Sequence, residues 1–82
     1  MSTKQLIEGL QTLQPFYDKP DGYNVGANHD MVYAYATNKP LTDEAIEKMI
    51  SLTWHQEYDG RDYGKDFSKE DYRDDETWHL YV

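Results

Sequence analysis

Aromatic rings lie among acids and bases near the C-terminus, where residues 58–76 read YDGRDYGKDFSKEDYRDDE. Carboxylates held close together on a folded scaffold imitate the regular negative charge of a nucleic-acid backbone, so they would pair with arginines and lysines that normally hold phosphates. The rings between them would supply the uncharged contact area that makes such an attraction specific. We therefore predict that this segment is a protein-binding surface. The residues assigned to it are Tyr58, Asp59, Asp62, Tyr63, Asp66, Glu70, Asp71, Tyr72, Asp74, Asp75 and Glu76.

Four basic residues interrupt the same segment and leave a second interpretation open. Arg61, Lys65, Lys69 and Arg73 follow one another at intervals of four positions, the spacing at which opposite charges pair along a helix. In that case the charges would neutralise one another locally. The segment would then be a solvated surface without a partner.

The histidines suggest a different kind of site. His55 and Glu57 alternate on one expected strand and His79 lies on another, so two imidazoles and a carboxylate would be available to one metal ion. Alternate residues of a strand are, however, about 7 Å apart, and the register between the two strands is open. Because histidines that follow tryptophans can equally be paired surface residues, we predict no metal site.

Calcium is the other cation to consider, because Asp59, Gly64 and Glu70 take the first, sixth and twelfth positions of an EF-hand loop. Arg61 and Tyr63 occupy the third and fifth positions, where such a loop needs oxygen ligands. The sequence also lacks a nucleophile elbow, a glycine-rich phosphate loop and an HExxH motif. We therefore expect a binding protein without a cofactor, and not an enzyme.

The charge balance excludes several partners. The chain of 82 residues has 8 Lys and Arg against 16 Asp and Glu, a net charge of −8, and such a surface repels DNA, RNA and anionic lipid. No window approaches the roughly 20 apolar residues that span a bilayer, and the absence of cysteine fits a reducing compartment. We expect a cytoplasmic protein that binds neither nucleic acid nor membrane directly. The aromatic content of 15% argues against disorder.

Hydrophobic spacing predicts two helices. One covers residues 3–14, where leucines recur at helical intervals and Ile7 widens the stripe expected to face the core. Gly9 at its centre indicates either close packing or a marginal helix. The other begins after Thr42, a good N-cap followed by two acids, and ends near Thr53 without a glycine.

Alternation of residue types predicts three strands. They cover residues 31–37, 54–58 and 77–82. Residues 24–30 include a short extended piece, and Ser68, three positions before Asp71, predicts a short helix in the long connection between the last two strands. The expected fold is a single α+β domain over residues 1–82. It has two layers, with both helices on one face of about three antiparallel strands in the order α-β-α-β-β.

The same alternation predicts which side chains share a face. The face toward the helices would hold Val32, Ala34, Ala36, Trp54, Trp78, Leu80 and Val82. The opposite, open face would hold Tyr33, Tyr35, His55, Glu57, His79 and Tyr81. Tyrosine gives a large contact area at low entropic cost and is enriched at interfaces, so we add Tyr33 and Tyr35 to the predicted binding surface.

The chain resembles the small acidic proteins that phages and mobile elements encode against host defence, such as anti-CRISPR proteins and DNA-mimic inhibitors. The resemblance lies in the length, the acidity, the lack of cysteine and the segment YDGRDYGKDFSKEDYRDDETW, and it involves no shared motif. It implies a stoichiometric inhibitor in the host cytoplasm, which occupies a basic surface of a host nucleic-acid-handling protein. The alternative is a homo-oligomeric structural or accessory phage protein that forms a homodimer through its tyrosine-rich face.

Overall fold

A computed structural model describes residues 2–56 and 68–81. The helices are α1 (Thr3–Leu13) and α2 (Asp43–Ser51), with single 3-10 turns at η1 (Gln14–Phe16) and η2 (Lys69–Asp71). The strands are β1 (Val25–Asn28), β2 (Met31–Ala34), β3 (His55–Gln56) and β4 (Trp78–Tyr81).

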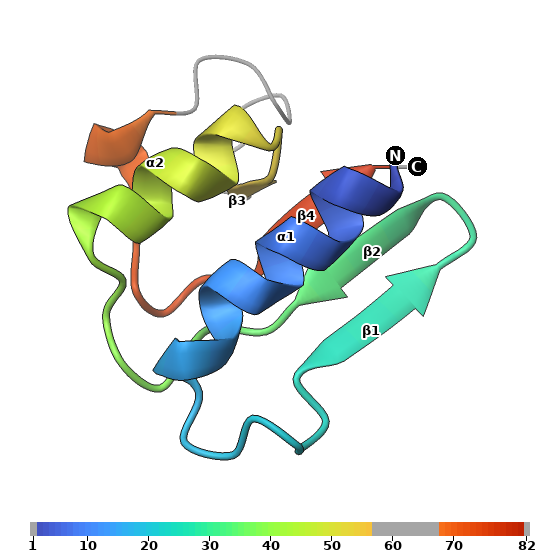
Figure 1. The fold of residues 1–82 in the computed structure, drawn as a ribbon, viewed down its shortest axis with the longest axis horizontal. Coiled ribbons are helices and arrows are strands. Elements are labelled where there is room, and N and C mark those ends of the chain that lie inside the picture. The colour runs from blue at the N-terminus through green and yellow to red at the C-terminus, as the bar shows by residue number, and fades with distance from the viewer. Residues whose placement is uncertain (1, 57–67, 82) are drawn as a thin grey trace.

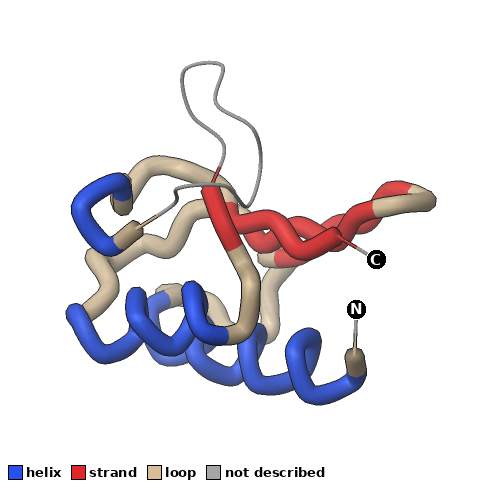
Figure 2. Tube along the Cα trace, turned by 90° about the horizontal axis from the view of Figure 1, so that it is seen from above, coloured by secondary structure: helices blue, strands red, loops and turns tan. Residues whose placement is uncertain are grey.

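The four strands form one antiparallel sheet in the order β1-β2-β4-β3 (Figure 1). Figure 2 shows the two long helices on one side of this sheet. The predicted α+β architecture is confirmed, and the extended piece expected within residues 24–30 supplies a fourth strand, β1.

α1 begins with a reciprocal cap. The Ser2 hydroxyl accepts a hydrogen bond from the Gln5 N–H at 3.1 Å, and the Gln5 side chain accepts one from the Ser2 N–H at 2.7 Å. Backbone donors that the first helical turn leaves unpaired are satisfied in this way. After Leu13 the chain tightens into η1, where Pro15 has no N–H with which to continue the α-helix. The helix predicted at residues 3–14 is thus confirmed to within one residue.

Gly9 lies at the point where Trp54 packs on α1. A Cβ atom at Gly9 would lie 2.2 Å from Nε1 of Trp54, a separation that real Cβ contacts essentially never show. The Trp54 indole N–H donates to the Gln5 carbonyl at 2.9 Å, which fixes the ring against the helix backbone. Of the two explanations that the sequence left open for this glycine, close packing is the one that the structure supports.

α2 begins as predicted and ends on a left-handed residue. Thr42 Oγ1 accepts a hydrogen bond from the N–H three residues further on, at 3.2 Å. Beyond the last turn, Thr53 has a φ of 67°, a conformation that glycine usually supplies. The Thr53 N–H donates to the Ile50 carbonyl at 2.9 Å and the Trp54 N–H to the Met49 carbonyl at 3.0 Å. The helix therefore ends in a Schellman motif that accommodates a threonine.

The core lies between the helices and the sheet. Its buried apolar members are Leu13, Tyr17, Val32, Ala34, Leu41, Ala45, Ile46, Met49, Leu52, Trp54, Trp78 and Leu80. Among the strand residues expected there, Ala36 is only half-buried, and Val82 lies outside the described residues. The prediction was wrong for Ile7, which is 48% exposed, because α1 lies over the centre of the sheet and leaves β1 uncovered (Figure 1). Tyr17 joins the core although no pattern predicted it.

Candidate functional site

The sheet face that turns away from the helices carries the predicted tyrosine and histidine side chains. In the register, Tyr33 lies opposite His79, Met31 lies opposite Tyr81, and His55 lies opposite His79. Directly paired residues of antiparallel strands point to the same face. Since the partners of Leu80 and Trp78 in β2 belong to the core, these side chains occupy the other side, as predicted.

Tyr33 and Tyr35 form the aromatic part of this open face. Their ring centroids are 5.5 Å apart, with an interplanar angle of 70°, the edge-to-face arrangement that aromatic pairs favour. Gly26 of β1 makes room for the first ring, because a Cβ atom there would lie 2.4 Å from Tyr33. The pKa of Tyr35 is raised by a hydrogen bond with Tyr33 and by the repulsion that the two phenols would exert on each other if both were ionised. Tyr35 therefore stays protonated at neutral pH, and it is 46% exposed.

His55 departs from the prediction of an exposed side chain, because it is only 3% exposed. Its ring stacks on Tyr81 with centroids 5.4 Å apart and on His79 with centroids 6.1 Å apart. Burial lowers the pKa of His55, although a backbone hydrogen bond to Thr53 acts in the opposite direction. A neutral imidazole packed between rings belongs to the fold and offers little surface to a partner.

The described part of the chain supplies no further ligands for the two cation sites that were considered from the sequence. Within residues 2–56 and 68–81, no group of three or more His, Asp or Glu side chains is placed to hold a metal ion. Glu57 was the third ligand considered for His55 and His79, and it lies outside the described residues. So does most of the EF-hand-like stretch at 59–70.

Part of the acidic segment is used to hold the fold. The Tyr72 hydroxyl accepts a hydrogen bond from the Leu41 N–H at 3.0 Å, and its ring stacks on Trp78 with centroids 6.1 Å apart. Asp71 accepts a hydrogen bond from the Ser68 N–H at 3.0 Å and caps η2, as the sequence predicted. These two members of the predicted binding surface are half-buried.

Other acids of the segment face solvent. Glu70, Asp74 and Asp75 are exposed, and Glu76 is half-buried. Hydrogen bonds from its own backbone N–H and from the Ser68 hydroxyl lower the pKa of Glu70, so its carboxylate is ionised at neutral pH. The remaining predicted residues lie outside the described part of the chain: Tyr58, Asp59, Asp62, Tyr63 and Asp66.

Gln56 holds the turn that presents these acids, and it was not predicted. Its side-chain oxygen accepts from the Arg73 N–H at 2.9 Å, and its nitrogen donates to the carbonyls of Arg73 at 2.8 Å and Glu76 at 3.2 Å. One buried amide thus fixes both ends of the turn that contains Asp74 and Asp75. A signal was present in the sequence, since alternation from Trp54 places a polar residue at a core position of β3.

Lys69 pairs with two acids of α2. Its Nζ atom lies 3.4 Å from the Glu47 carboxylate and 3.9 Å from that of Asp43. η2, which is a single 3-10 turn, therefore packs beside α2 (Figure 1).

A hollow on the open face brings three of the predicted residues together. Tyr33, Tyr35 and Glu76 line it, and its volume is about 550 Å³. The other lining residues are Asn28, Met31, Thr77 and His79. A carboxylate beside two phenol rings suits a cationic side chain, because both the carboxylate and the ring faces attract positive charge.

No protein-family model, curated protein or solved structure matches this chain. Within the described residues, no helix combines the length and apolar character needed to cross a membrane. We therefore infer function from the side chains themselves.

Proposed function

We propose that this chain is a small acidic protein-binding domain that acts as a stoichiometric inhibitor of a nucleic-acid-handling protein in the cytoplasm of a bacterial host. The observation that carries the proposal is the hollow in which Glu76 meets Tyr33 and Tyr35. The exposed carboxylates of Asp74 and Asp75 directly precede Glu76 in the chain. This proximity of charge and aromatic contact area supports the use of both on one partner.

Each part of this surface has a physical role in competition with nucleic acid. The net charge of −8 steers the domain toward a basic surface and speeds association. The hollow would take an arginine or lysine side chain that otherwise contacts a phosphate. Because Gln56 already orders the acidic turn, binding would cost little additional conformational entropy.

Affinity capture tests the proposal. The immobilised protein is exposed to bacterial lysate, with parallel washes at low and high salt and with duplex DNA as competitor. We expect a basic nucleic-acid-handling protein to be retained at low salt and displaced by DNA, because both ligands use the same positive surface.

A matched pair of variants locates the contact. Asp74→Lys with Asp75→Lys should abolish retention. Asp18→Lys with Asp21→Lys makes the same change of net charge at exposed positions far from these acids in the sequence, and it should weaken retention only slightly. Equal retention by the first double variant and the unchanged protein would contradict the role of the acidic turn.

A second candidate function is self-association through the open face. It is favoured by one observation, that Tyr35 and Tyr81 are both exposed large rings on a sheet face that neither α1 nor α2 covers. A homodimer would bury them against a second copy. Light scattering coupled to size-exclusion chromatography distinguishes the two functions, since a stable dimer that Tyr35→Ala converts to a monomer would support this candidate.

A further inference from the structure

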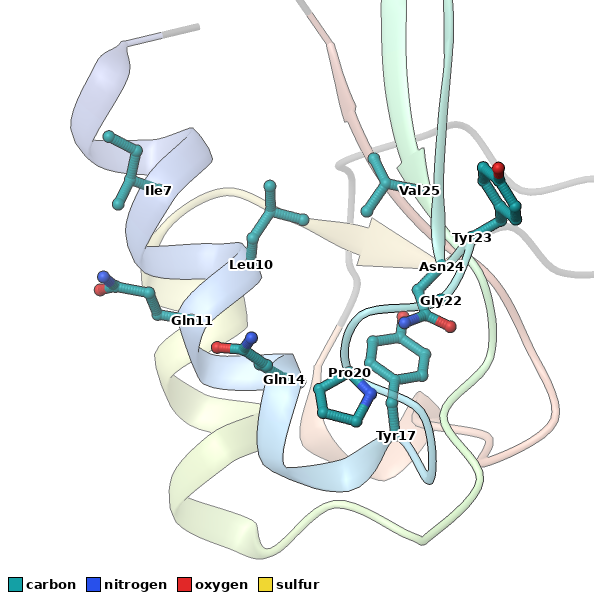
Figure 3. A pocket seen from close by; sticks show the side chains of 10 residues that line it. All are labelled: Ile7, Leu10, Gln11, Gln14, Tyr17, Pro20, Gly22, Tyr23, Asn24 and Val25. Atoms are coloured by element: carbon teal, nitrogen blue, oxygen red, sulfur yellow. The ribbon is translucent and has the colours of Figure 1, made fainter.

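A groove separates α1 from β1 on the helix side of the sheet (Figure 3). Its volume is about 360 Å³. Figure 3 shows Leu10 pointing from α1 toward Val25 of β1, with Tyr17 and Pro20 at one end. Ile7 extends the apolar wall of α1, and Val25, which faces it across the groove, is 44% exposed. The groove is therefore an apolar surface that the fold itself leaves uncovered.

The backbone of β1 offers hydrogen bonds along the same groove. The Tyr35 N–H donates to the Asn24 carbonyl at 2.9 Å. Bonded and non-bonded pairs alternate in antiparallel strands, so Gly26 and Asn28 also bond to β2, while Val25 and Ala27 direct their N–H and C=O groups outward. β1 is an edge strand, and no described strand lies on that side to receive them.

The side chains of these two residues lie on the groove side. Val25 is paired with Ala34 and Ala27 with Val32, and both partners belong to the core beneath the helices. A chain that paired with the outward groups of β1 would therefore lay every second side chain over the groove. β1 also lacks proline and charge, two devices by which natural edge strands avoid such pairing.

We propose that β1 and the groove form a docking site for an extended, basic segment of another protein. The segment adds a strand to the sheet beside β1 and inserts an apolar side chain between Val25 and Leu10. The outward backbone groups call for an extended chain, and the net charge of −8 favours a basic one. A second copy of this protein would bring an equal negative charge, so it is the less favoured occupant of this edge. The proposal does not depend on the acidic surface.

A peptide titration tests the site. The probe is a blocked seven-residue peptide in which lysine alternates with valine, phenylalanine and valine, added to the whole ¹⁵N-labelled chain. We expect hydrogen exchange of the Val25 and Ala27 amides to slow about tenfold or more, because pairing protects them. The Gly26 and Asn28 amides, already bonded to β2, should keep their exchange rates.

Three variants sharpen the test without removing core contacts. Ile7→Asp places a carboxylate in the apolar wall and should weaken binding about tenfold or more. Thr3→Asp adds the same charge at an exposed position of the same helix and should leave affinity nearly unchanged. Ala27→Pro removes an outward N–H that the sheet does not use, so the fold should persist while binding is lost.

Three results would overturn the proposal. One is a response at the wrong residues, namely protection from exchange at Gly26 and Asn28 or chemical-shift changes that map only to the open-face tyrosines. Another is the absence of any shift at about 1 mM peptide, which corresponds to negligible affinity. The third is a dimer that Ala27→Pro dissociates, because β1 would then pair with its own copy. A peptide of the same composition with its apolar residues consecutive controls for attraction by charge alone.

Discussion

The two edges of the sheet are used in opposite ways. β3 has two residues, both buried, and the side-chain amide of Gln56 forms hydrogen bonds with the acidic turn. β1 has four residues, of which three are exposed, and its outer backbone groups border an open groove. An edge strand must be either protected or available for pairing. Substitutions near β3 should therefore damage the fold, whereas those on β1 should mainly change binding.

The largest effect is expected where Trp54 leads into β3. Gly9→Ala improves helix propensity by about 1 kcal/mol, but the new Cβ atom would collide with the Trp54 ring, which has no room to move away from its bond to Gln5. We expect a net loss of about 3 kcal/mol in the free energy of unfolding, measured in urea. Gln11→Ala, on the exposed face of the same helix, should change it by less than about 0.5 kcal/mol. Equal free energies of unfolding for the two variants would show that the close packing of Trp54 on Gly9 does not stabilise the fold.

Gln56→Leu should have the next largest effect. The substitution keeps the volume but removes the hydrogen bonds that Gln56 makes to the Arg73 N–H and to the carbonyls of Arg73 and Glu76, at a cost of about 2 kcal/mol. Faster amide exchange at Arg73 would report the loosened turn. Gln14→Leu is the matched control, because that side chain is exposed. A stable Gln56→Leu variant with unchanged exchange would remove the structural role given to β3.

Substitution of Tyr17 should have an intermediate effect, and this residue also makes the free energy of unfolding depend on pH. Burial raises its pKa to about 12 from 10.0, so the folded state favours the protonated phenol. This contribution is complete below pH 10 and is lost as the pH rises toward 12. We expect a loss of about 1 kcal/mol between those limits after allowance for solvent screening.

Unfolding in urea at several alkaline pH values measures this loss. Tyr17→Phe should flatten the alkaline slope, although it also removes the hydrogen bond from the Tyr17 hydroxyl to the Tyr35 carbonyl. Tyr23→Phe changes a fully exposed phenol and should leave the slope as it is. A slope that both variants share with the unchanged protein would assign the pH dependence to other groups.

The smallest effect is expected on β1. Val25→Thr exchanges a methyl for a hydroxyl on a side chain that solvent already reaches, so stability should change by less than about 0.5 kcal/mol. The same exchange at Val32, which is buried in neighbouring β2, should cost about 2 kcal/mol, because it buries a hydroxyl. Thermal unfolding of the two variants side by side measures the contrast. A comparable loss at both positions would mean that β1 is not a free edge.

Local patterns were sufficient to predict much of the fold. The caps at Thr42 and Ser68 involve residues a few positions apart, so their chemistry is visible in the sequence. Strand alternation likewise assigned Tyr33 and His79 to one face. Such features depend on neighbours along the chain, and the structure confirms them.

Features that depend on distant partners were not predicted. Tyr72 was assigned to the binding surface for its place among acids, but its hydroxyl meets Leu41 and its ring meets Trp78. The sequence left open a pairing of Lys69 four positions away along a helix, whereas in the structure its Nζ atom lies beside acids of α2 and η2 is a single turn. The groove beside β1 was missed because nothing in the spacing of Ile7 and Leu10 shows that α1 does not cover the edge strand.

The central claim, that the acidic surface replaces nucleic acid on a partner, is tested most directly by competition. Labelled duplex DNA is bound to the captured protein, and this domain is added in increments while fluorescence anisotropy reports the bound DNA. We expect complete displacement at one domain per binding site, with Asp74→Lys and Asp75→Lys together preventing it. A ternary complex, in which DNA stays bound while the domain binds as well, would contradict the claim.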